Sequence, residues 1–439
     1  MTGEPGSFLR VAREYDRKGS LTEAATAYRA VIASAEAVGD RRVAAEALRR
    51  LAVVHCRLQQ SAPARDLCSR SEVLARETGD ADLLAEALNT AGGIDLVDEC
   101  FDTAQMHFIR AASIAADPDL LGRIEQNLAT IASTRGDYDE ALVRYQRSLE
   151  GFLAASNVHG CAVAYHNLGV ASIELRHWDD ADRYLRLCLT SVQRTGDLHL
   201  HGLAALNHAE ALTWLGRLRE ARVAAETSIG VFDELHAPRE LADAYRILGG
   251  VLRRSGELPA AQTRLHLAVE VASTSRCALS EAEATRDLAI VLAALGQVPQ
   301  ALAMMARAAT ELQRLKPAVA SAATLGEYPA SVRAWRDLLE VMDPNAAANS
   351  ERVATRAVAV ARELGCDEAA QVRIRLAGCL YGFEAAWLVA ESLPSDVAGI
   401  LRNVPTGGSL ESKIVALAAD CERERTLNSA DGSSDRLSA

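Results

Sequence analysis

The chain has 439 residues, of which 49% are hydrophobic and 4% aromatic, and its formal net charge is −12 at pH 7. This acidic balance removes any general electrostatic basis for binding nucleic acid. No apolar run reaches the roughly 18–20 residues that cross a bilayer, and the N-terminus lacks the apolar core of a signal peptide. We therefore expect a cytoplasmic protein that neither enters a membrane nor contacts nucleic acid directly.

The nine cysteines are scattered and never form a CxxC pair. Several stand among apolar residues of helical segments, as Cys188 does in YLRLCL. Reduced cysteines commonly serve as small hydrophobic residues, so this usage agrees with a cytoplasmic location.

A period of 40 residues governs the chain from its start to about residue 316. A turn followed by an alanine recurs eight times, and every interval between these alanines is 40 residues except one of 37. The aligned alanines are Ala24, Ala64, Ala104, Ala141, Ala181, Ala221, Ala261 and Ala301. A constant period of this size indicates a solenoid, and each unit reads as two amphipathic helices. We predict eight helix pairs over residues 5–316, preceded by a disordered segment at residues 1–4.

The ends of several predicted helices carry a recurring signal. A Gly-Asp pair closes the units at residues 39–40, 79–80 and 196–197. The glycine can take the left-handed conformation that ends one helix, and the aspartate can then cap the next. In the third unit, residues 117–118 are Asp-Pro, and we expect this proline to end the helix, since proline cannot continue it.

The fourth, fifth and seventh units resemble tetratricopeptide repeats, as in YHNLGVASIELRHWDDADRYLRLCL. The small positions of that family are matched by Ala129, Gly169 and Gly249, and its bulky positions by Leu128, Tyr145, Tyr165, Leu168, Tyr245 and Leu248. The third unit departs most, with Gly92-Gly93 inside its first helix. The resemblance covers roughly residues 5–316 and implies an all-α protein, a right-handed superhelical solenoid of about eight helix pairs.

The resemblance also implies that the first helix of each pair lines a concave wall. Asn127, Asn167 and Asn207 stand at one equivalent position, 40 residues apart. In peptide-binding members of the family such an asparagine hydrogen-bonds the ligand, but it is also a consensus residue that can bond to its neighbours, and both interpretations remain open. The nearby polar residues are Arg123, Gln126, His166, Glu210, Arg246, Arg253 and Arg254. The lysines of the family's carboxylate clamp are absent, so no complete clamp can be identified.

The period stops after residue 316, and we interpret residues 317–329 as a linker. The following segment resembles the start of an HD-GYP-type phosphodiesterase domain, with Asp-Pro at 343–344 before Ser-Glu-Arg-Val at 350–353. The metal-binding positions of that family correspond here to Asn349, Tyr381, Gly382 and Ala419, none of which matches the histidine or aspartate that the family carries there. In addition, all ten histidines lie at or before His266.

These replacements predict a small helical domain at residues 330–425 that binds no metal and no cofactor, followed by a disordered tail at 426–439. The leading hypothesis is a non-catalytic scaffold or signalling adaptor that holds a peptide or protein partner in the solenoid groove, with homo-oligomerisation through the C-terminal domain as a further expectation. A regulator that responds to a ligand or peptide through a partner is the alternative. Residual nucleotide binding or phosphodiesterase activity is a second alternative.

Overall fold

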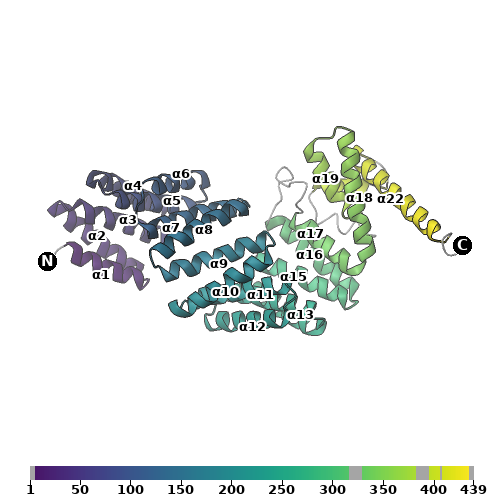
Figure 1. Ribbon diagram of the computed structural model, residues 1–439, viewed down its shortest axis with the longest axis horizontal. Coiled ribbons are helices and arrows are strands. Elements are labelled where there is room, and N and C mark those ends of the chain that lie inside the picture. Colours follow the sequence, from purple (N-terminus) through teal and green to yellow (C-terminus); the bar gives the residue numbers. More distant parts are fainter. Residues whose placement is uncertain (1–4, 316–328, 382–394, 406–407, 435–439) are drawn as a thin grey trace. The chain divides into compact units, whose positions relative to one another are not determined.

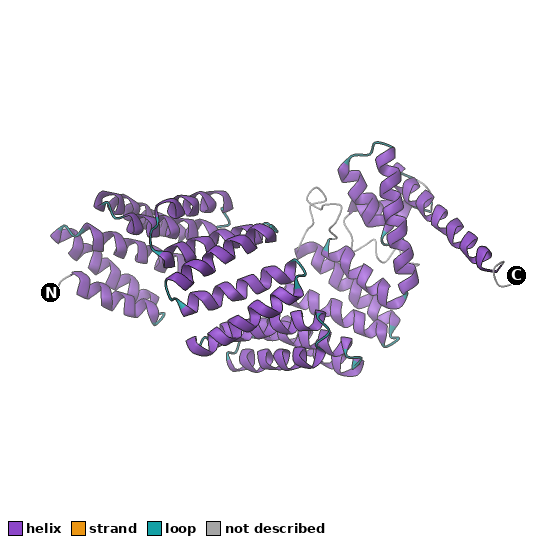
Figure 2. Cartoon of the chain, in the orientation of Figure 1, coloured by secondary structure: helices purple, strands orange, loops and turns teal. Residues whose placement is uncertain are grey.

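The computed structural model describes residues 5–315, 329–381, 395–405 and 408–434 (Figure 1). Over these ranges every regular element is an α-helix and no strand occurs (Figure 2). The chain forms two compact units, the N-terminal unit Met1–Ala211 and the C-terminal unit Leu212–Ala439. The boundary between the units falls within α11 (Leu198–Trp214).

The N-terminal unit consists of consecutive antiparallel helices. These are α1 (Pro5–Arg17), α2 (Leu21–Val38), α3 (Arg41–Arg57), α4 (Ser61–Thr78), α5 (Ala81–Val97), α6 (Phe101–Ile114), α7 (Pro118–Thr134), α8 (Tyr138–Ala154), α9 (Val158–Glu174), α10 (Trp178–Thr195) and most of α11. The C-terminal unit continues the series with α12 (Leu218–Glu234), α13 (Pro238–Arg254), α14 (Leu258–Thr274), α15 (Ala278–Ala294) and α16 (Val298–Leu315). Counted from α1 to α16, the chain contains the eight helix pairs that the sequence predicts, so the prediction of an all-α solenoid is confirmed.

From α1 to α10 and from α12 to α16 each helix packs on the next one along the chain, and first helices of successive pairs also pack on one another, as α3 does on α5 and α13 on α15. Over the described ranges no comparable packing joins the second helices of successive pairs. Because the first helices approach one another more closely, they form the inner side of the curve within each unit. The polar residues singled out in the sequence all lie on these inner helices.

The periodic alanines lie where the two helices of a pair meet. All eight have an exposed fraction of 0%. The small positions of the first helices are just as crowded: a Cβ added at Gly169 would lie 2.6 Å from Leu185 Cγ, and one at Gly249 would lie 2.5 Å from Leu265 Cγ. The structure therefore confirms the predicted role of the small residues, which is to let neighbouring helices approach closely.

The Gly-Asp pairs end and begin helices as predicted. Gly39, Gly79 and Gly196 have φ values of 76°, 70° and 72°, and Asp40, for example, accepts a hydrogen bond from the Val43 amide at 3.1 Å. The expectation for residues 117–118 was wrong, because α6 already ends at Ile114 and these residues start α7 instead. Asp117 accepts a hydrogen bond from the Asp119 amide at 3.1 Å, and the proline occupies the first turn, where no amide donor is needed.

The same left-handed turn conformation is also adopted by residues other than glycine. In the turn inside a helix pair, glycine takes it at residues 19, 136, 216, 256 and 296. At the equivalent place in other pairs stand Gln59, Glu99 and Arg176, with φ values of 59°, 59° and 58°. The turn geometry therefore recurs whether or not glycine is present.

Beyond the eighth pair, the C-terminal unit adds α17 (Ala330–Met342), α18 (Pro344–Glu363), α19 (Glu368–Gly378), α21 (Ser395–Asn403) and α22 (Leu410–Ser434). α17 packs on α15 and α16, and Ser331 Oγ donates to Gln313 Oε1 at 2.9 Å. α18 packs on α19 and α22. None of the helices in the described ranges is long and apolar enough to cross a membrane.

Parts of the predicted domain boundaries lie outside the described residues, namely residues 1–4, 317–328 and 435–439. The sequence predicted a disordered tail from residue 426, whereas α22 continues to Ser434. Extending an existing helix adds one backbone hydrogen bond for each residue fixed, so polar residues can prolong a helix that has already begun.

Candidate partner-binding surface

Amide and imidazole side chains on the inner helices of the N-terminal unit are bonded from one helix pair to the next. Asn127 Nδ2 donates to Asn89 Oδ1 at 3.1 Å, which joins α7 to α5. Asn207 Nδ2 lies 3.0 Å from His166 Nε2, which joins α11 to α9. The predicted asparagines thus contact polar side chains of the preceding inner helix.

His166 connects two of these asparagines. Its Nδ1 lies 3.3 Å from Asn167 Oδ1, while its Nε2 faces the amide group of Asn207. A neutral imidazole that carries its proton on Nδ1 satisfies both contacts, because it then donates to Asn167 and accepts from Asn207. Burial lowers the pKa of His166, which favours this neutral form.

Arg123 belongs to a chain of ion pairs. Its Nη2 donates to Glu86 Oε1 at 3.0 Å and its Nε to Asp119 Oδ2 at 3.2 Å. Glu86 also pairs with Arg49 on α3. The guanidinium of Arg123 is therefore held by its neighbours. Glu210, the remaining acidic residue singled out in the sequence, lies on α11 and is half-buried.

Arg246 lies in the C-terminal unit and takes part in a second charged cluster. Its Nη1 lies 3.5 Å from Asp287 Oδ2 and its Nη2 3.8 Å from Glu283 Oε2. Asp287 also accepts from Arg286 Nη2 at 2.7 Å. Burial alone would raise the pKa of Asp287, but the nearby guanidinium groups of Arg286 and Arg246 hold it below its usual value.

A contact that the sequence analysis missed joins Trp214 to Arg254. The guanidinium carbon of Arg254 lies 4.1 Å from the centre of the Trp214 ring, and Arg254 Nη1 donates to the Thr213 carbonyl at 3.3 Å. Trp214 as a whole residue stays 48% exposed. A signal was present, since the two residues stand 40 apart at equivalent ends of α11 and α13.

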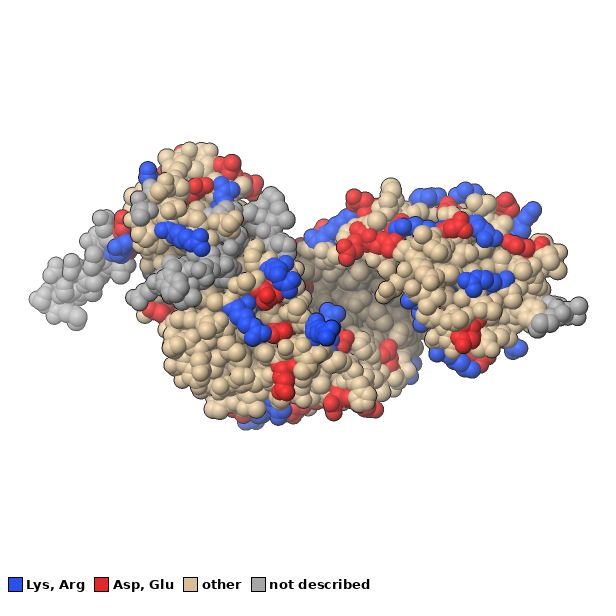
Figure 3. All heavy atoms as spheres, turned by 180° about the vertical axis from the view of Figure 1, so that it is seen from behind, with Lys and Arg blue, Asp and Glu red and all other residues tan. Residues whose placement is uncertain are grey.

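On the face that Figure 3 shows, arginine and lysine side chains lie among aspartate and glutamate side chains. Arg253 and Arg254 differ from the paired arginines described above, because neither forms an ion pair with any carboxylate in the described ranges. Both were named from the sequence as polar residues of an inner helix.

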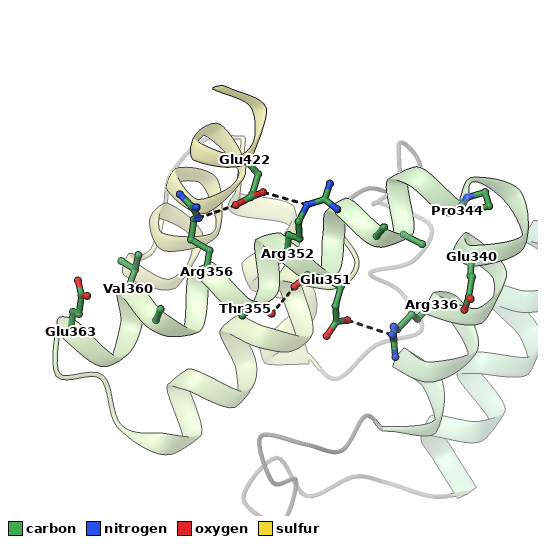
Figure 4. A pocket seen from close by; sticks show the side chains of 13 residues that line it. Arg336, Glu340, Pro344, Glu351, Arg352, Thr355, Arg356, Val360, Glu363 and Glu422 are labelled. Atoms are coloured by element: carbon green, nitrogen blue, oxygen red, sulfur yellow. Dashed lines mark hydrogen bonds and ion pairs between the residues drawn. The ribbon is translucent and has the colours of Figure 1, made fainter. Parts of the chain in front are cut away.

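α17, α18 and α22 border an open cavity of about 890 Å³ (Figure 4). Glu422, whose exposed fraction is 3%, forms two ion pairs. Its Oε2 lies 3.3 Å from Arg352 Nε and its Oε1 3.0 Å from Arg356 Nε. Arg336 pairs with Glu351 across the cavity at 3.5 Å. The remaining lining residues are Glu340, Pro344, Ala347, Ala348, Thr355, Ala359, Val360 and Glu363. The arginines of this cavity are therefore held by carboxylates of the same walls.

The positions that correspond to metal ligands of HD-GYP-type domains have ordinary structural contacts. Asn349 on α18 accepts a hydrogen bond from Arg352 at 3.3 Å, and the Tyr381 hydroxyl accepts one from Arg423 at 3.1 Å. Ala419 on α22 is buried, while Gly382 lies outside the described residues. Within the described ranges, no three His, Cys, Asp or Glu side chains are grouped so that they could hold a metal ion.

Two segments match models of the tetratricopeptide repeat, residues 83–154 and residues 161–195. Together with the eight helix pairs, these matches confirm that the chain contains tetratricopeptide repeats and that its fold is their solenoid. A comparison with curated proteins gave no match.

Several solved structures are similar to this chain at low sequence identity. A Rap protein complexed with Competence and Sporulation Factor aligns with a TM-score of 0.51 and 11% identity over 85% of this chain and 99% of that one. A STAND signal transduction ATPase with a tetratricopeptide repeat sensor from Pyrococcus horikoshii aligns with a TM-score of 0.50 and 13% identity over 88% of this chain and 54% of that one. BtubC from P. vanneervenii is 21% identical, with a TM-score of 0.43 over 48% of this chain and 91% of that one. At these identities the likeness concerns the fold alone.

Proposed function

We propose that the chain is a non-catalytic scaffold whose inner helices bind a peptide or protein segment. The observation that carries this proposal is the series of contacts from Asn167 through His166 to Asn207. Each contact fixes an amide group while using only part of its hydrogen-bonding capacity, since an asparagine offers two donors and a carbonyl oxygen. The remaining donors and acceptors, held in fixed orientations on half-buried side chains, suit the main chain of an extended peptide.

The helix-pair fold supports the same proposal. Tetratricopeptide solenoids present an extended inner surface to a partner, and the solved Rap protein that shares this fold was determined in complex with Competence and Sporulation Factor. For this chain, a role in signalling and a cytoplasmic location are part of the proposal.

The double variant Asn167→Ala, Asn207→Ala tests the groove. A displayed library of random peptides is selected on the wild-type chain, and the enriched peptides are then measured against both proteins. We expect the double variant to bind these peptides roughly tenfold more weakly, because two fixed amide groups are lost. Circular dichroism should show unchanged helicity.

Gln193→Ala is the matched control, because Gln193 is an exposed amide on the second helix α10. It should bind the selected peptides like the wild type. Equal peptide affinity in the double variant and the wild type would remove the inner face of the N-terminal unit as the binding surface.

We also propose that helices α17 to α22 form a docking domain without phosphodiesterase activity. This part rests on the sequence resemblance and on the residues Asn349, Tyr381 and Ala419, none of which offers a metal-binding imidazole or carboxylate. Metal analysis of the purified chain, combined with an assay of cyclic-dinucleotide hydrolysis, tests it. Stoichiometric iron or manganese with turnover would contradict the proposal.

A further inference from the structure

The stacked pair Trp214 and Arg254 forms an ordered feature on the inner side of the C-terminal unit. Arg254 is fixed from two directions, by the indole ring at 4.1 Å and by the Thr213 carbonyl at 3.3 Å. Trp214 nevertheless remains 48% exposed as a residue. Exposed tryptophan and arginine side chains with fixed orientations are the residues most often found at the energetic centres of protein interfaces.

Among the described residues no carboxylate forms an ion pair with Arg253 or Arg254, although the charge of Arg253 acts on Asp287. Arg246 and Arg286 on the same inner surface are both held by Asp287, whereas Arg253 and Arg254 form no ion pair with the described residues. Burial and the neighbouring charge of Arg253 both lower the pKa of Arg254. The two guanidinium groups therefore repel each other, and a bound anion would relieve that repulsion.

Space for a ligand lies beside the pair. Gly250 precedes Arg254 by one helical turn, and a Cβ added there would meet no atom within 4 Å. The residue of the next inner helix, α15, that is equivalent to Arg254 is Ala294, which is small and exposed. The surface next to Arg254 is therefore not filled by side chains of the neighbouring helix.

We propose that Trp214, Arg253 and Arg254 anchor an acidic peptide segment, with a carboxylate on the arginines and the adjoining apolar side chain on the exposed indole surface. Arginine binds a carboxylate with two parallel hydrogen bonds, and the stacking contact orients the guanidinium group before the ligand arrives. This inference rests on the proposed peptide-binding function but concerns the C-terminal unit.

A nucleic acid would use the same kinds of side chain, but two observations favour a peptide. Arg254 already covers one face of the indole ring, which a stacked base would need. In addition, Glu283 and Asp287 lie on the neighbouring inner helix α15, and their carboxylates would repel a polyanion more than a single carboxylate.

Fluorescence anisotropy with the full chain tests the anchor. The probes are labelled Gly/Ser nonapeptides with an amidated end that carry either Glu-Phe or Gln-Phe at their centre, a third that ends in Phe with a free carboxylate, and a labelled oligouridylate. We expect the Glu-Phe peptide to bind roughly tenfold more tightly than the Gln-Phe peptide, with an affinity that falls as salt is added. The third peptide shows whether a terminal carboxylate serves as well.

Arg254→Gln should remove that tenfold preference, Arg254→Lys should retain part of it, and the control Arg264→Gln, an exposed arginine on α14, should retain all of it. Circular dichroism checks that each variant is folded. Equal binding of the two amidated peptides, equal behaviour of Arg254→Gln and Arg264→Gln, tighter binding of the oligouridylate, or no peptide binding at all would each overturn the anchor.

The Asn167→Ala, Asn207→Ala variant separates this inference from the proposed function. If that double variant loses its selected peptides while Arg254→Gln keeps the Glu-Phe preference of the wild type, the anchor is wrong and the groove of the N-terminal unit stands. If the reverse holds, peptide binding resides in the C-terminal unit.

Discussion

The inner helices of the two units share one design but carry different polar groups. In the N-terminal unit, asparagine and histidine side chains join successive inner helices, as Asn207 and His166 do. Both units carry ion pairs on their inner helices, at Arg123 in the N-terminal unit and at Arg246 in the C-terminal unit, but only in the C-terminal unit does the structure describe an arginine, Arg254, stacked on a tryptophan, Trp214. The difference teaches that the buried small residues set the helix-pair geometry, whereas the inner-face positions can change their chemistry without changing the fold.

The shared design predicts equal and large effects at Gly169 and Gly249, one in each unit. Replacing either by alanine forces a Cβ within 2.6 Å of a buried leucine, so we expect a loss of about 2–3 kcal/mol in the free energy of unfolding. Urea denaturation followed by circular dichroism measures it. Gly250→Ala is the control, because open space and better helix propensity should stabilise the chain by up to about 1 kcal/mol. Similar losses in Gly249→Ala and Gly250→Ala would show that the close approach is not the cause.

The ion pair of Arg286 and Asp287 in the C-terminal unit should contribute more to the free energy of unfolding than the ion pairs of Arg123 in the N-terminal unit. Arg286→Ala removes the guanidinium group closest to the carboxylate of Asp287, and we expect a loss of about 2 kcal/mol in the free energy of unfolding. This value lies between those of exposed and buried ion pairs, because both side chains keep about a fifth of their surface exposed. Arg123→Ala in the N-terminal unit should cost less than about 1 kcal/mol, since Arg123 is 38% exposed. Hydrogen exchange of α15 and α7 in each variant localises the effect, and equal losses would contradict the comparison.

The smallest expected effect is on the pH dependence. The folded state lowers the pKa of His166, so the unfolded chain binds more protons and the stability contributed by neutral His166 is lost as the pH falls below about 6.5. The folded state also lowers the pKa of Asp287, so its contribution persists until the pH falls below about 4. When amide protection from hydrogen exchange is compared at pH 7.5 and pH 5.5, α9 should therefore lose protection at the lower pH while α15 keeps it. His166→Gln should remove the dependence in α9, and an unchanged pH response in that variant would assign it to another group.

The fold could be predicted because its signals are local and repeated. The alanines at 40-residue intervals are the buried contacts within pairs, and Asp40 caps its helix through residues three positions away. The partners on the inner face could not be read from the same period. Asn127 meets Asn89 at a separation of 38 residues, and Asn207 meets His166 at 41. Neighbouring helices are offset, so side chains in contact do not stand at equivalent positions.

The Trp214 and Arg254 contact is the exception, since its spacing is 40 residues. It was missed because a tryptophan at the end of a helix reads as a packing residue until its exposure is known. The C-terminal helices lack a period, so only the resemblance indicated their arrangement. For that reason the relation of α17 to α22 with HD-GYP-type domains stays a prediction.

The left-handed turn residues bear on the order in which the pairs fold. A residue other than glycine costs roughly 1–2 kcal/mol in this conformation, so the pairs that turn at Gln59, Glu99 and Arg176 close at a greater cost than those that turn at glycine. In a linear array, folding can begin at any pair and spread to its neighbours. Each of the three consecutive pairs from α11 to α16 turns at glycine, at residues 216, 256 and 296, but the turns that join these pairs hold His236 and Arg276 at φ values of 50° and 56°. We therefore expect a pair that turns at glycine to close more readily than the second, third and fifth pairs, while the joining of pairs carries the cost of His236 and Arg276.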